Sequence, residues 1–447
     1  MKILLINPPR SNQNAILENA SETVKPFIHR KLIGPPLGLI TIASALKGTH
    51  DVSVLDLKGE CDLYKDTVDY LLVVKRWLAE KKPDIVGVTF IASEFNAGLE
   101  IFKAAKGFDP LIITIAGGLH VSLCPHHFDS PLVDIACRGQ SGRIIQTVVS
   151  VIERGESLDS VGGILVRRGN HFRPTPSDTV PCNAAGDDFI VPAREMLNPW
   201  LSTYYVAKNE GPVTYLFTSL GCPYKCTFCS IWPQFDGAYY QRKVDSIIDE
   251  LKMLDQYPVV RFADANTIVN IDFIDTLFTR IEQEGIKKQF IMDIRTDTAV
   301  KYPDLIRKCA KGGLKVVISG FESFRDDELT RYNKVSEADT IRKAVKIFDD
   351  NGIMVRGNYV IPPDYTEKDF NALRKFAGES TVALAGYTIL TPMPGTQFYY
   401  DQFDAINDHD LSKYNFFNCV MKTALPLDKY YKEVSDLWLV RKGTETI

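Results

Sequence analysis

The sequence predicts an α/β protein: a doubly wound, Rossmann-like domain, then a partial, TIM-like (βα)6 barrel, then a short and mainly helical C-terminal cap. Three observations support this fold class. Short apolar runs alternate with amphipathic stretches of helical period, as in parallel sheets that helices cover on both faces. A proline-containing stretch at residues 156–200 interrupts the alternation, which then resumes as six further units. The length of 447 residues suits two or three domains better than one.

The first predicted domain covers residues 1–155. Its strands are apolar throughout, which indicates burial on both faces, and are expected at residues 2–7, 51–57, 84–91, 111–118 and 133–139. The helices between them are expected at residues 37–47, 67–81, 94–106 and 142–154. Parallel sheets of this kind bind ligands at the carboxyl ends of their strands. The loops at those ends are therefore the candidate ligand site of this domain.

The composition of those loops limits the ligand. No GxGxxG follows the first strand and no GxxxxGK[ST] occurs, so dinucleotides and nucleoside triphosphates are disfavoured. Small residues and prolines occupy the loops instead and permit a large flat ligand to approach closely. The candidate contacts are Asn7, Pro8, Pro9, Pro36, Leu37, Gly38, Thr89, Ser93, Gly117, Gly118, His120 and Gly139. A lone histidine such as His120 is at least as often a local hydrogen-bonding group, and His126 and His127 are interpreted as loop residues without a role.

Residues 156–200 are predicted to form a hairpin and a linker, because Gly169-Asn170 favours a tight turn and several prolines follow it. The barrel is expected at residues 201–396, with strands at 213–218, 259–262, 289–294, 314–319, 354–361 and 382–390. Its helices are expected at residues 244–254, 272–284, 303–311, 337–351 and 367–378. Aromatic residues are frequent in the predicted cap, residues 397–447, where they more often pack than bind.

Three cysteines follow the first strand of the barrel. Cys222, Cys226 and Cys229 lie in the stretch LFTSLGCPYKCTFCSIW. A single loop can bring thiols at this spacing onto one inorganic cluster, and Gly221 and Pro223 oppose a regular helix there. Three thiolates leave one iron of a four-iron cluster open. The pattern therefore predicts an iron–sulfur site with one free coordination position.

Two alternatives to an iron–sulfur site are weaker. A zinc site lacks a fourth ligand, because the nearest other cysteines in the sequence are Cys182 and Cys309. Burial of the three cysteines on one face of a helix is opposed by the glycine and the proline. The other six cysteines are interpreted as ordinary thiols, and they are Cys61, Cys124, Cys137, Cys182, Cys309 and Cys419.

The CxxxCxxC run, including Phe228 before its last cysteine, resembles the signature of the radical S-adenosylmethionine (SAM) superfamily. In that family the three thiolates bind a [4Fe–4S] cluster, and the amino and carboxylate groups of SAM occupy the open iron. Residues 1–155 resemble the cobalamin-binding domain of many radical SAM enzymes, through their Asn-Pro-Pro, Pro-Pro-Leu-Gly-Leu and Gly-Gly loops. Together these likenesses cover nearly the whole chain. They indicate a cobalamin (B12)-dependent radical SAM enzyme, similar to the class B methyltransferases.

Polar residues at successive strand ends of the barrel resemble by position the groups that bind SAM in this family. They are Asp264, Asn266, Arg295, Glu322, Ser323 and Asn358, in addition to Phe228. Carboxylates and amides suit hydroxyl and ammonium groups, and a guanidinium suits a carboxylate. For each residue alone, a solvated loop position or a helix cap is the alternative.

The resemblance implies that the reduced cluster donates an electron to SAM and that a 5′-deoxyadenosyl radical abstracts hydrogen from an unactivated carbon. Methylcobalamin would then deliver a methyl group to that carbon of a small-molecule or lipid-like substrate. An external one-electron reductant such as flavodoxin or ferredoxin is also implied. Cyclisation, rearrangement or ring contraction without methyl transfer is an alternative, and a cobalamin-sensing or interaction protein with a structural cluster is a second. Methylthiolation of tRNA is disfavoured, because no basic C-terminal RNA-binding domain is evident.

Composition and charge disfavour several partners. A hydrophobic content of 45% and a charged content of 24% are typical of a soluble globular protein. The formal net charge of -4 favours neither nucleic acid nor an anionic membrane. The start MKILLINPPR lacks the apolar stretch of a signal peptide, and no segment approaches about 18 uninterrupted apolar residues. We therefore expect a cytoplasmic protein without an integral membrane segment, in a reducing compartment that suits nine cysteines without a disulfide framework.

Overall fold

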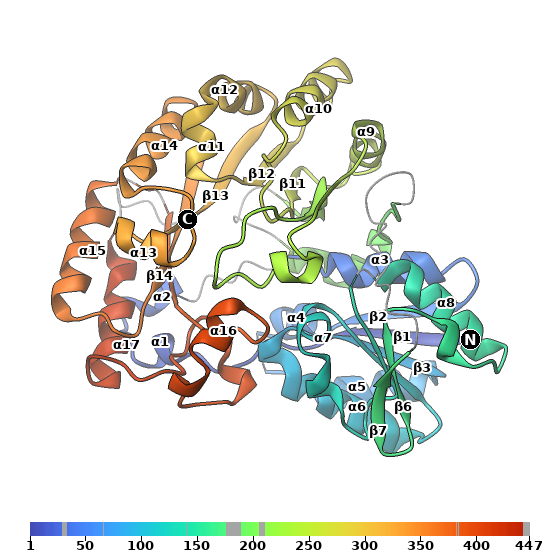
Figure 1. The fold of residues 1–447 in the computed structure, drawn as a ribbon. Coiled ribbons are helices and arrows are strands. Elements are labelled where there is room, and N and C mark those ends of the chain that lie inside the picture. Colours follow the sequence, from blue (N-terminus) through green and yellow to red (C-terminus); the bar gives the residue numbers. More distant parts are fainter. Residues whose placement is uncertain are drawn as a thin grey trace. The chain divides into compact units, whose positions relative to one another are not determined.

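The structure is a computed structural model that describes residues 1–28, 34–65, 67–139, 141–175, 189–204, 211–380, 382 and 384–440. The chain divides into two compact units, whose helices and strands Figure 1 labels. The first unit comprises Met1–Asn12, Pro35–Tyr204 and Pro233–Asp236. The second comprises Gln13–Gly34, Tyr205–Trp232 and Gly237–Ile447. Most of the predicted proline-rich linker, with Cys182, and the last residues of the predicted cap lie outside the described residues.

The first unit is built on a seven-stranded sheet of order β2-β1-β3-β4-β5-β6-β7. Its strands are β1 (Lys2–Asn7), β2 (Asp51–Asp56), β3 (Ile85–Thr89), β4 (Ile113–Gly117), β5 (Ile135–Cys137), β6 (Ile164–Arg168) and β7 (His171–Pro174). Strands β1 to β5 pair in parallel, whereas β6 and β7 continue the sheet as an antiparallel hairpin. The doubly wound prediction is confirmed, and the chain order reverses between β1 and β3, where such sheets bind ligands.

Helices pack on this sheet between the strands. They are α3 (Leu37–Leu46), α4 (Leu57–Leu63), α5 (Tyr70–Lys81), α6 (Phe95–Phe108), α7 (Leu119–Leu123) and α8 (Ser141–Glu153), followed by the 3-10 helix η4 (Arg194–Thr203). The four long helices agree with the sequence prediction. Helices α4 and α7 were not predicted, because segments of 7 and 5 residues directly after a strand are too short to show a helical period.

The second unit contains a six-stranded, fully parallel sheet of order β15-β14-β13-β12-β11-β8, which confirms the predicted partial barrel. Its strands are β8 (Val213–Leu216), β11 (Val259–Phe262), β12 (Gln289–Asp293), β13 (Leu314–Glu322), β14 (Met354–Ile361) and β15 (Leu384–Ile389). A small antiparallel pair, β9 (Ser219–Gly221) and β10 (Tyr239–Gln241), flanks the segment that contains the three cysteines. Parallel order places the carboxyl ends of all six barrel strands at one edge.

Helices alternate with the barrel strands and continue into the C-terminal region. They are α9 (Val244–Lys252), α10 (Ile271–Gln283), α11 (Thr296–Lys301), α12 (Pro303–Lys311), α13 (Asp326–Arg331), α14 (Ala338–Asp350), α15 (Glu367–Glu379), α16 (Gln397–Asp401) and α17 (Leu427–Asp436). The C-terminal region is mainly helical, as the sequence predicts. Among the described residues, no helix combines the length and the apolar character needed to cross a membrane.

A segment near the N-terminus belongs to the second unit, which the sequence did not predict. It contains α1 (Ala15–Glu18), which lies beside α17, and α2 (Lys25–Ile28), which lies beside the 3-10 helix η8 (Leu437–Leu439). Figure 1 labels α1, α2 and α17. The Ile16 backbone N–H donates to Phe417 O at 3.3 Å, and Asn415 Nδ2 donates to Gln13 O at 2.7 Å. Partners about 400 positions apart leave no local pattern, so only the folded chain reveals this pairing.

Candidate functional site

The three cysteines of the CxxxCxxC motif lie in the loop after β9. All three are free thiols, of which Cys226 is buried and the other two are half-buried. Burial raises the pKa of each thiol, and burial together with the sulfurs of Cys226 and Cys222 raises the pKa of Cys229 to about 11. Buried thiols become thiolates when a metal stabilises the negative charge, so this loop fits a metal cluster.

Hydrogen bonds from distant segments shape the cysteine loop. The backbone N–H of Thr227 donates to Tyr332 O at 3.0 Å, and Asn333 Nδ2 donates to Lys225 O at 2.8 Å. The backbone N–H of Phe398 donates to Thr227 O at 2.9 Å. The turn after α13 and the start of α16 therefore hold the loop in place, although it has little regular structure of its own.

Aromatic rings flank the cysteines. Phe228, a predicted SAM contact, packs edge-on against Tyr332 with the ring centroids 5.5 Å apart. Trp232 Nε1 donates to Cys226 O at 2.9 Å, and the ammonium of Lys225 lies 5.9 Å from the centre of the Trp232 ring. These contacts cover the backbone of the loop with apolar surface. The structure therefore engages Phe228 in packing.

Arg295 reaches the cysteine loop from the end of β12. Its guanidinium lies 3.9 Å from the centre of the Tyr224 ring and binds Asp297 through two hydrogen bonds of 2.9 and 3.0 Å. Burial dominates the raised pKa of Cys222, and the positive charge of Arg295 acts against it. This predicted residue therefore lies beside the cysteines, where a cation stabilises bound thiolates or a ligand carboxylate.

The end of β13 brings a buried ion pair to the same loop. Lys334 donates to Glu322 at 2.9 Å, and burial together with Glu322 raises the pKa of Cys226 while Lys334 lowers it. Glu322 has a left-handed backbone with φ 60°, and the pairing of β13 with β14 shifts register between Gly320 and Glu322. Left-handed backbone at a residue other than glycine costs about 1–3 kcal/mol and is concentrated at functional sites. The irregularity turns the Glu322 carboxylate toward the loop.

Asp264, at the end of β11, holds the segment that leads into the cysteine loop. Its carboxylate accepts the backbone N–H of Thr218 at 2.8 Å, the Thr218 hydroxyl at 2.6 Å and the backbone N–H of Ser219 at 2.9 Å. Burial raises the pKa of Asp264 to about 6, although these hydrogen bonds lower it. Both carboxylate oxygens are engaged, so the geometry favours a positioning role for this predicted SAM contact.

The two asparagines at the predicted SAM site differ in their partners. Asn266 Nδ2 has a 3.5 Å contact to Ile268 O, but Asn266 Oδ1 is buried without a hydrogen-bond partner among the described residues. The Asn358 side chain lies close to Gly386 of the neighbouring strand β15. A Cβ added at Gly386 would come within 2.6 Å of Asn358 Oδ1. A buried acceptor without a partner is costly, which favours a ligand that donates to Asn266.

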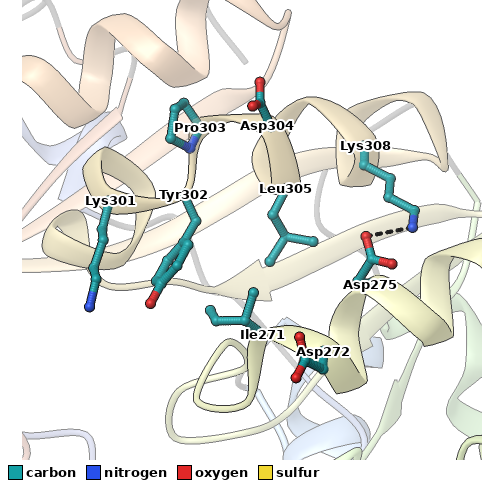
Figure 2. Close-up of a pocket in the computed structure, with 9 residues that line it drawn as sticks. All are labelled: Ile271, Asp272, Asp275, Lys301, Tyr302, Pro303, Asp304, Leu305 and Lys308. Carbon is teal, nitrogen blue, oxygen red and sulfur yellow. Dashed lines mark hydrogen bonds and ion pairs between the residues drawn. The ribbon is translucent and has the colours of Figure 1, made fainter.

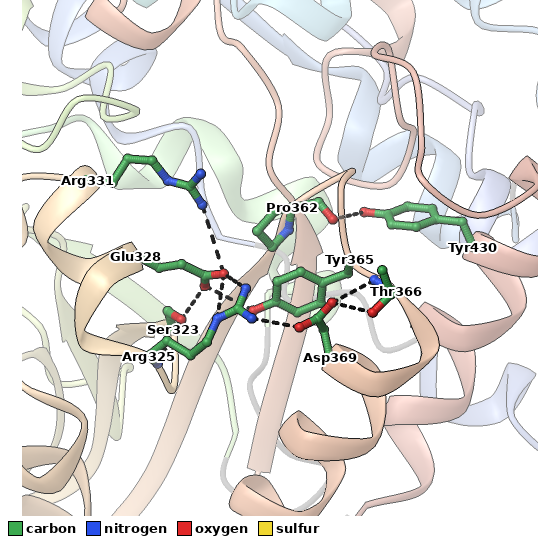
Figure 3. Close-up of polar contacts among 9 residues, drawn as sticks. All are labelled: Ser323, Arg325, Glu328, Arg331, Pro362, Tyr365, Thr366, Asp369 and Tyr430. Carbon is green, nitrogen blue, oxygen red and sulfur yellow. Dashed lines mark hydrogen bonds and ion pairs between the residues drawn. The ribbon is translucent and has the colours of Figure 1, made fainter.

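Ser323 belongs to a polar network at the end of β13 (Figure 3). Its hydroxyl donates to Glu328 and accepts the backbone N–H of Arg325 at 3.1 Å. The buried carboxylate of Glu328 also accepts from the Tyr365 hydroxyl at 3.0 Å and from Arg325 Nε at 2.9 Å. Arg325 continues to Asp369 of α15 at 2.7 Å. The network ties the loop after β13 to α15 and engages the Ser323 side chain.

A charged group inside the barrel was not predicted. Arg261 donates to Asp293 at 2.9 and 3.3 Å and to the Tyr215 hydroxyl at 3.4 Å. Arg356 lies nearby, and its pKa is lowered by burial and by the charge of Arg261. These residues interrupt otherwise apolar strand segments, VVRF, QFIMD and MVRGNYVI. A charge within a predicted buried strand was therefore a signal that could have identified them.

A pocket in the second unit lies among α10, α11 and α12 (Figure 2). It is lined by Ile271, Asp272, Asp275, Lys301, Tyr302, Pro303, Asp304, Leu305 and Lys308. The ion pair between Lys308 and Asp275, at 2.6 Å, forms one side of it. None of these residues belongs to the cysteine loop or to the predicted SAM site, so we do not assign this pocket to the active site.

Two glycines of the first unit leave space for a ligand, Gly38 near the start of α3 and Gly117 at the end of β4. At both positions an added Cβ would meet no heavy atom within 4 Å. Gly118, by contrast, has φ 101°, and its Cβ would lie 2.7 Å from the backbone nitrogen of Phe90. The open Gly117 beside the tightly packed Gly118 forms a cradle that side chains would fill, which fits close approach of a large flat ligand.

Other predicted contacts of the first unit have partners within it. Asn7 Nδ2 donates to Asp56 at 2.7 Å, and the Tyr204 hydroxyl donates to the second Asp56 oxygen at 2.5 Å. His120 is 2% exposed, and its Nε2 lies 3.1 Å from Nδ1 of His127. The remaining predicted contacts are buried or half-buried at strand ends, in loops or at the start of the helices that follow, and they are Pro8, Pro9, Pro36, Leu37, Thr89, Ser93 and Gly139.

Two family models match the chain, one in each part. Residues 26–149 match the B12 binding domain, and residues 216–377 match the radical SAM superfamily. An uncharacterized methyltransferase of Pyrococcus horikoshii is 28% identical over 89% of this chain and 82% of its own length. The hopanoid C-3 methylase of Methylococcus capsulatus is 24% identical over 89% and 75%. An anaerobic magnesium-protoporphyrin IX monomethyl ester cyclase of Rubrivivax gelatinosus is 26% identical over 87% and 70%.

Solved structures share the fold. The radical SAM methyltransferase TsrM of Kitasatospora setae, with tryptophan and a SAM analogue bound, aligns with a TM-score of 0.71 at 16% identity. The alignment covers 98% of this chain and 89% of TsrM. The cobalamin-dependent radical SAM enzyme OxsB aligns with a TM-score of 0.65 at 17% identity, over 92% of this chain and 56% of OxsB. The chain thus combines a B12-binding domain with a radical SAM domain whose cysteine loop fits the cluster, and its cofactors are cobalamin, SAM and a [4Fe–4S] cluster.

Proposed function

We propose that this chain is a C-methyltransferase that methylates an unactivated carbon of a small-molecule or lipid-like substrate. The observation that carries the proposal is the convergence of three free thiols with Arg295 and the Glu322–Lys334 pair at the strand ends of the radical SAM domain. Two of the full-length relatives, from Pyrococcus horikoshii and Methylococcus capsulatus, are described as a methyltransferase and a methylase. When bound, the cluster and SAM supply a hydrogen-abstracting radical and cobalamin supplies the methyl group.

The second unit would hold and orient SAM with its own side chains. Cys222, Cys226 and Cys229 would ligate the cluster. Arg295 holds Asp297 through Nε and Nη2 and offers the N–H donors of Nη1 to a carboxylate. Asn266 Oδ1, which has no partner among the described residues, offers an acceptor to an ammonium or a hydroxyl. Residues whose side chains have partners within the unit would support these groups by holding the strand ends, and they are Phe228, Asp264, Glu322 and Ser323. Asn358, which lies against Gly386 of β15, would be a further contact.

The first unit would bind cobalamin mainly through backbone and small side chains. The open space at Gly38, near the start of α3, and at Gly117, at the end of β4, supports this assignment, because a bulky planar ligand needs room. Apolar groups of the same loops would cover the corrin ring, and they are Pro8, Pro9, Pro36 and Leu37. The partners of the enzyme would then be a small-molecule substrate and an external one-electron reductant such as flavodoxin or ferredoxin.

Product analysis tests the methyltransferase proposal. The chain is reconstituted with cluster and cobalamin without oxygen, then incubated with reductant, methyl-labelled SAM and extracts that contain polar or lipid metabolites. A methyltransferase that uses one SAM as radical source and another as methyl donor forms S-adenosylhomocysteine together with 5′-deoxyadenosine, and the label enters a third compound. Deoxyadenosine without S-adenosylhomocysteine or label transfer would reject methylation. The Cys229→Ala variant provides the blank.

A second candidate is cyclisation or rearrangement without methyl transfer. The relative in Rubrivivax gelatinosus, described as a cyclase, is about as similar in sequence as the two methylases. The same product analysis separates the two candidates, because a cyclase forms deoxyadenosine and an unlabelled product.

A further inference from the structure

A histidine, a cysteine and a second histidine converge in the first unit, away from the CxxxCxxC loop. They are His120 in α7, Cys124 directly after it and His127 in the 3-10 helix η2 (Pro125–Phe128). One potential ligand atom from each, two imidazole nitrogens and one sulfur, lie within 4.8 Å of one another. The motif HxxxCxxH within eight consecutive residues is therefore folded into a compact donor set.

The distances are close to those of a tetrahedral metal site. Zinc–nitrogen bonds of about 2.0–2.1 Å place two imidazole nitrogens about 3.3 Å apart across a tetrahedral ion. His120 Nε2 and His127 Nδ1 are 3.1 Å apart. The sulfur must approach each nitrogen to within about 3.5 Å for a zinc–sulfur bond of about 2.3 Å. The three ligand atoms lie within 4.8 Å of one another, so the Cys124 sulfur needs to move by no more than about 1 Å. A small rotation of the Cys124 side chain would bring it to the required distance.

The scaffold holds these three side chains in place. The backbone N–H of Cys124 donates to His120 O at 2.8 Å, and that of His127 donates to Cys124 O at 3.1 Å. The rings of Phe95 and Phe128 pack edge-on against the His120 ring, each with centroids 5.7 Å apart. Local backbone hydrogen bonds set the spacing of the donors, and aromatic contacts orient the imidazoles. A site organised before binding loses little entropy when an ion enters.

The donors have little else to bind. His120 and Cys124 are 2% and 1% exposed. In the described part of the chain the polar partner of the His120 ring is His127, and the Cys124 thiol has no hydrogen-bond partner. One proton joins the two facing imidazole nitrogens in a single hydrogen bond, and the buried thiol is left without a polar partner among the described residues. A divalent ion would satisfy all three donors at once.

We propose that His120, Cys124 and His127 bind one divalent ion of the zinc class, with water at the fourth position. Two imidazoles and a thiolate suit zinc and other borderline or soft ions, whereas magnesium and calcium require oxygen ligands. Binding releases the thiol proton of Cys124 to solvent, and the imidazole that holds the shared proton binds as its other tautomer, with the proton on its outer nitrogen, without a change in oxidation state. The ion pins α7 to η2, in the segment that follows Gly117 and Gly118. This inference does not rest on the proposed methyl transfer.

Cobalt titration of the full chain tests the site. The background variant Cys222→Ala, Cys226→Ala, Cys229→Ala removes the other group of three thiols, which would also bind divalent ions. In this background we expect one equivalent of Co²⁺ to give the visible bands of a tetrahedral ion and a thiolate-to-cobalt band in the ultraviolet, both removed by one equivalent of Zn²⁺. Adding His127→Ala should weaken Zn²⁺ binding at least about 100-fold.

Two further variants keep the test decisive. Cys124→Ser should abolish the thiolate-to-cobalt band, and His171→Ala, which removes an exposed imidazole of the same unit, should change nothing. Circular dichroism without metal checks that each variant is folded, and His127 is the least buried of the three donors. Absence of stoichiometric binding in the background variant would overturn the proposal. So would a folded His127→Ala or Cys124→Ser variant that binds Zn²⁺ as tightly as its parent.

Discussion

The strand ends of the two parallel sheets offer a ligand different things. In the second unit they carry charged and amide side chains, such as Arg295, Glu322 and Asn266. In the first unit the end of β4 offers open space at Gly117, and the polar side chain of Asn7, at the end of β1, is bound to Asp56 of the same unit. A site made of side chains is lost when atoms are removed, whereas a site made of backbone and space is lost when atoms are added. The two units should therefore respond to opposite kinds of substitution.

The largest effect is expected from removing a cluster ligand. Cys229→Ala leaves two thiolates in the loop, which we expect to abolish both the [4Fe–4S] absorption and SAM cleavage to background. Corrinoid uptake by the first unit should persist, which separates the two kinds of site. Cys419→Ala, which removes a half-buried thiol elsewhere in the second unit, is the control and should keep both activities. SAM cleavage by Cys229→Ala at the wild-type rate would contradict the assignment of this loop.

Adding atoms to the first unit should distinguish the tightly packed glycine from the open one. Gly118→Ala forces a Cβ within 2.7 Å of the Phe90 backbone at φ 101°, so we expect a loss of about 2–4 kcal/mol in the free energy of unfolding. Gly117→Val places its side chain in open space and should leave that free energy within about 1 kcal/mol of wild type. If cobalamin approaches Gly117, this variant still loses corrinoid uptake, as spectra after desalting would show. Full uptake by Gly117→Val would argue against the cradle.

The buried carboxyl of Asp264, at a strand end of the second unit, should make the stability of the protein depend on pH. Burial raises its pKa from 3.8 to about 6, so between about pH 4 and 6 the native state holds a proton that the unfolded chain has released. The contribution of this carboxyl to the free energy of unfolding therefore falls as the pH rises through that window, by about 2–3 kcal/mol. Asp264→Asn cannot titrate, so the wild-type value minus the variant value, from urea unfolding, should decrease from pH 4 to pH 6. An increase would mean that the three hydrogen bonds outweigh burial.

The smallest effect is expected in the network that supports the barrel. Tyr365→Phe removes one of the hydrogen bonds to the buried Glu328 carboxylate, which should cost about 1–2 kcal/mol of stability. SAM cleavage per folded molecule should stay near the wild-type rate, because the hydroxyl supports the loop and touches no cysteine. Lys346→Ala, which removes an exposed pair with Asp350, should change stability by less than about 0.5 kcal/mol. A Tyr365→Phe variant of unchanged stability but reduced cleavage would place this tyrosine in the site itself.

Local patterns predicted most of the regular elements. Residues 2–7 form β1 as expected, because a run of apolar residues ended by Asn7-Pro8-Pro9 leaves little choice. The five-residue helix α7 was not predicted, since so short a segment has no period to detect. For the same reason His126 and His127 were interpreted as loop residues and Cys124 as an ordinary thiol. Their convergence with His120 depends on one turn of helix that the sequence pattern did not indicate.

The sequence by itself determined the two sheets, their order along the chain and the three-cysteine loop, because apolar period, glycine, proline and cysteine spacing act over a few residues. The tertiary structure alone decided what lies next to that loop. Tyr332 and Phe398, which clamp it through Thr227, come from segments more than 100 residues away. It also decided that backbone N–H groups and the Thr218 hydroxyl engage the two oxygens of Asp264, while Asn266 Oδ1 has no partner among the described residues. Residue type states which bonds a side chain can make, and only the folded chain determines which of them are already made.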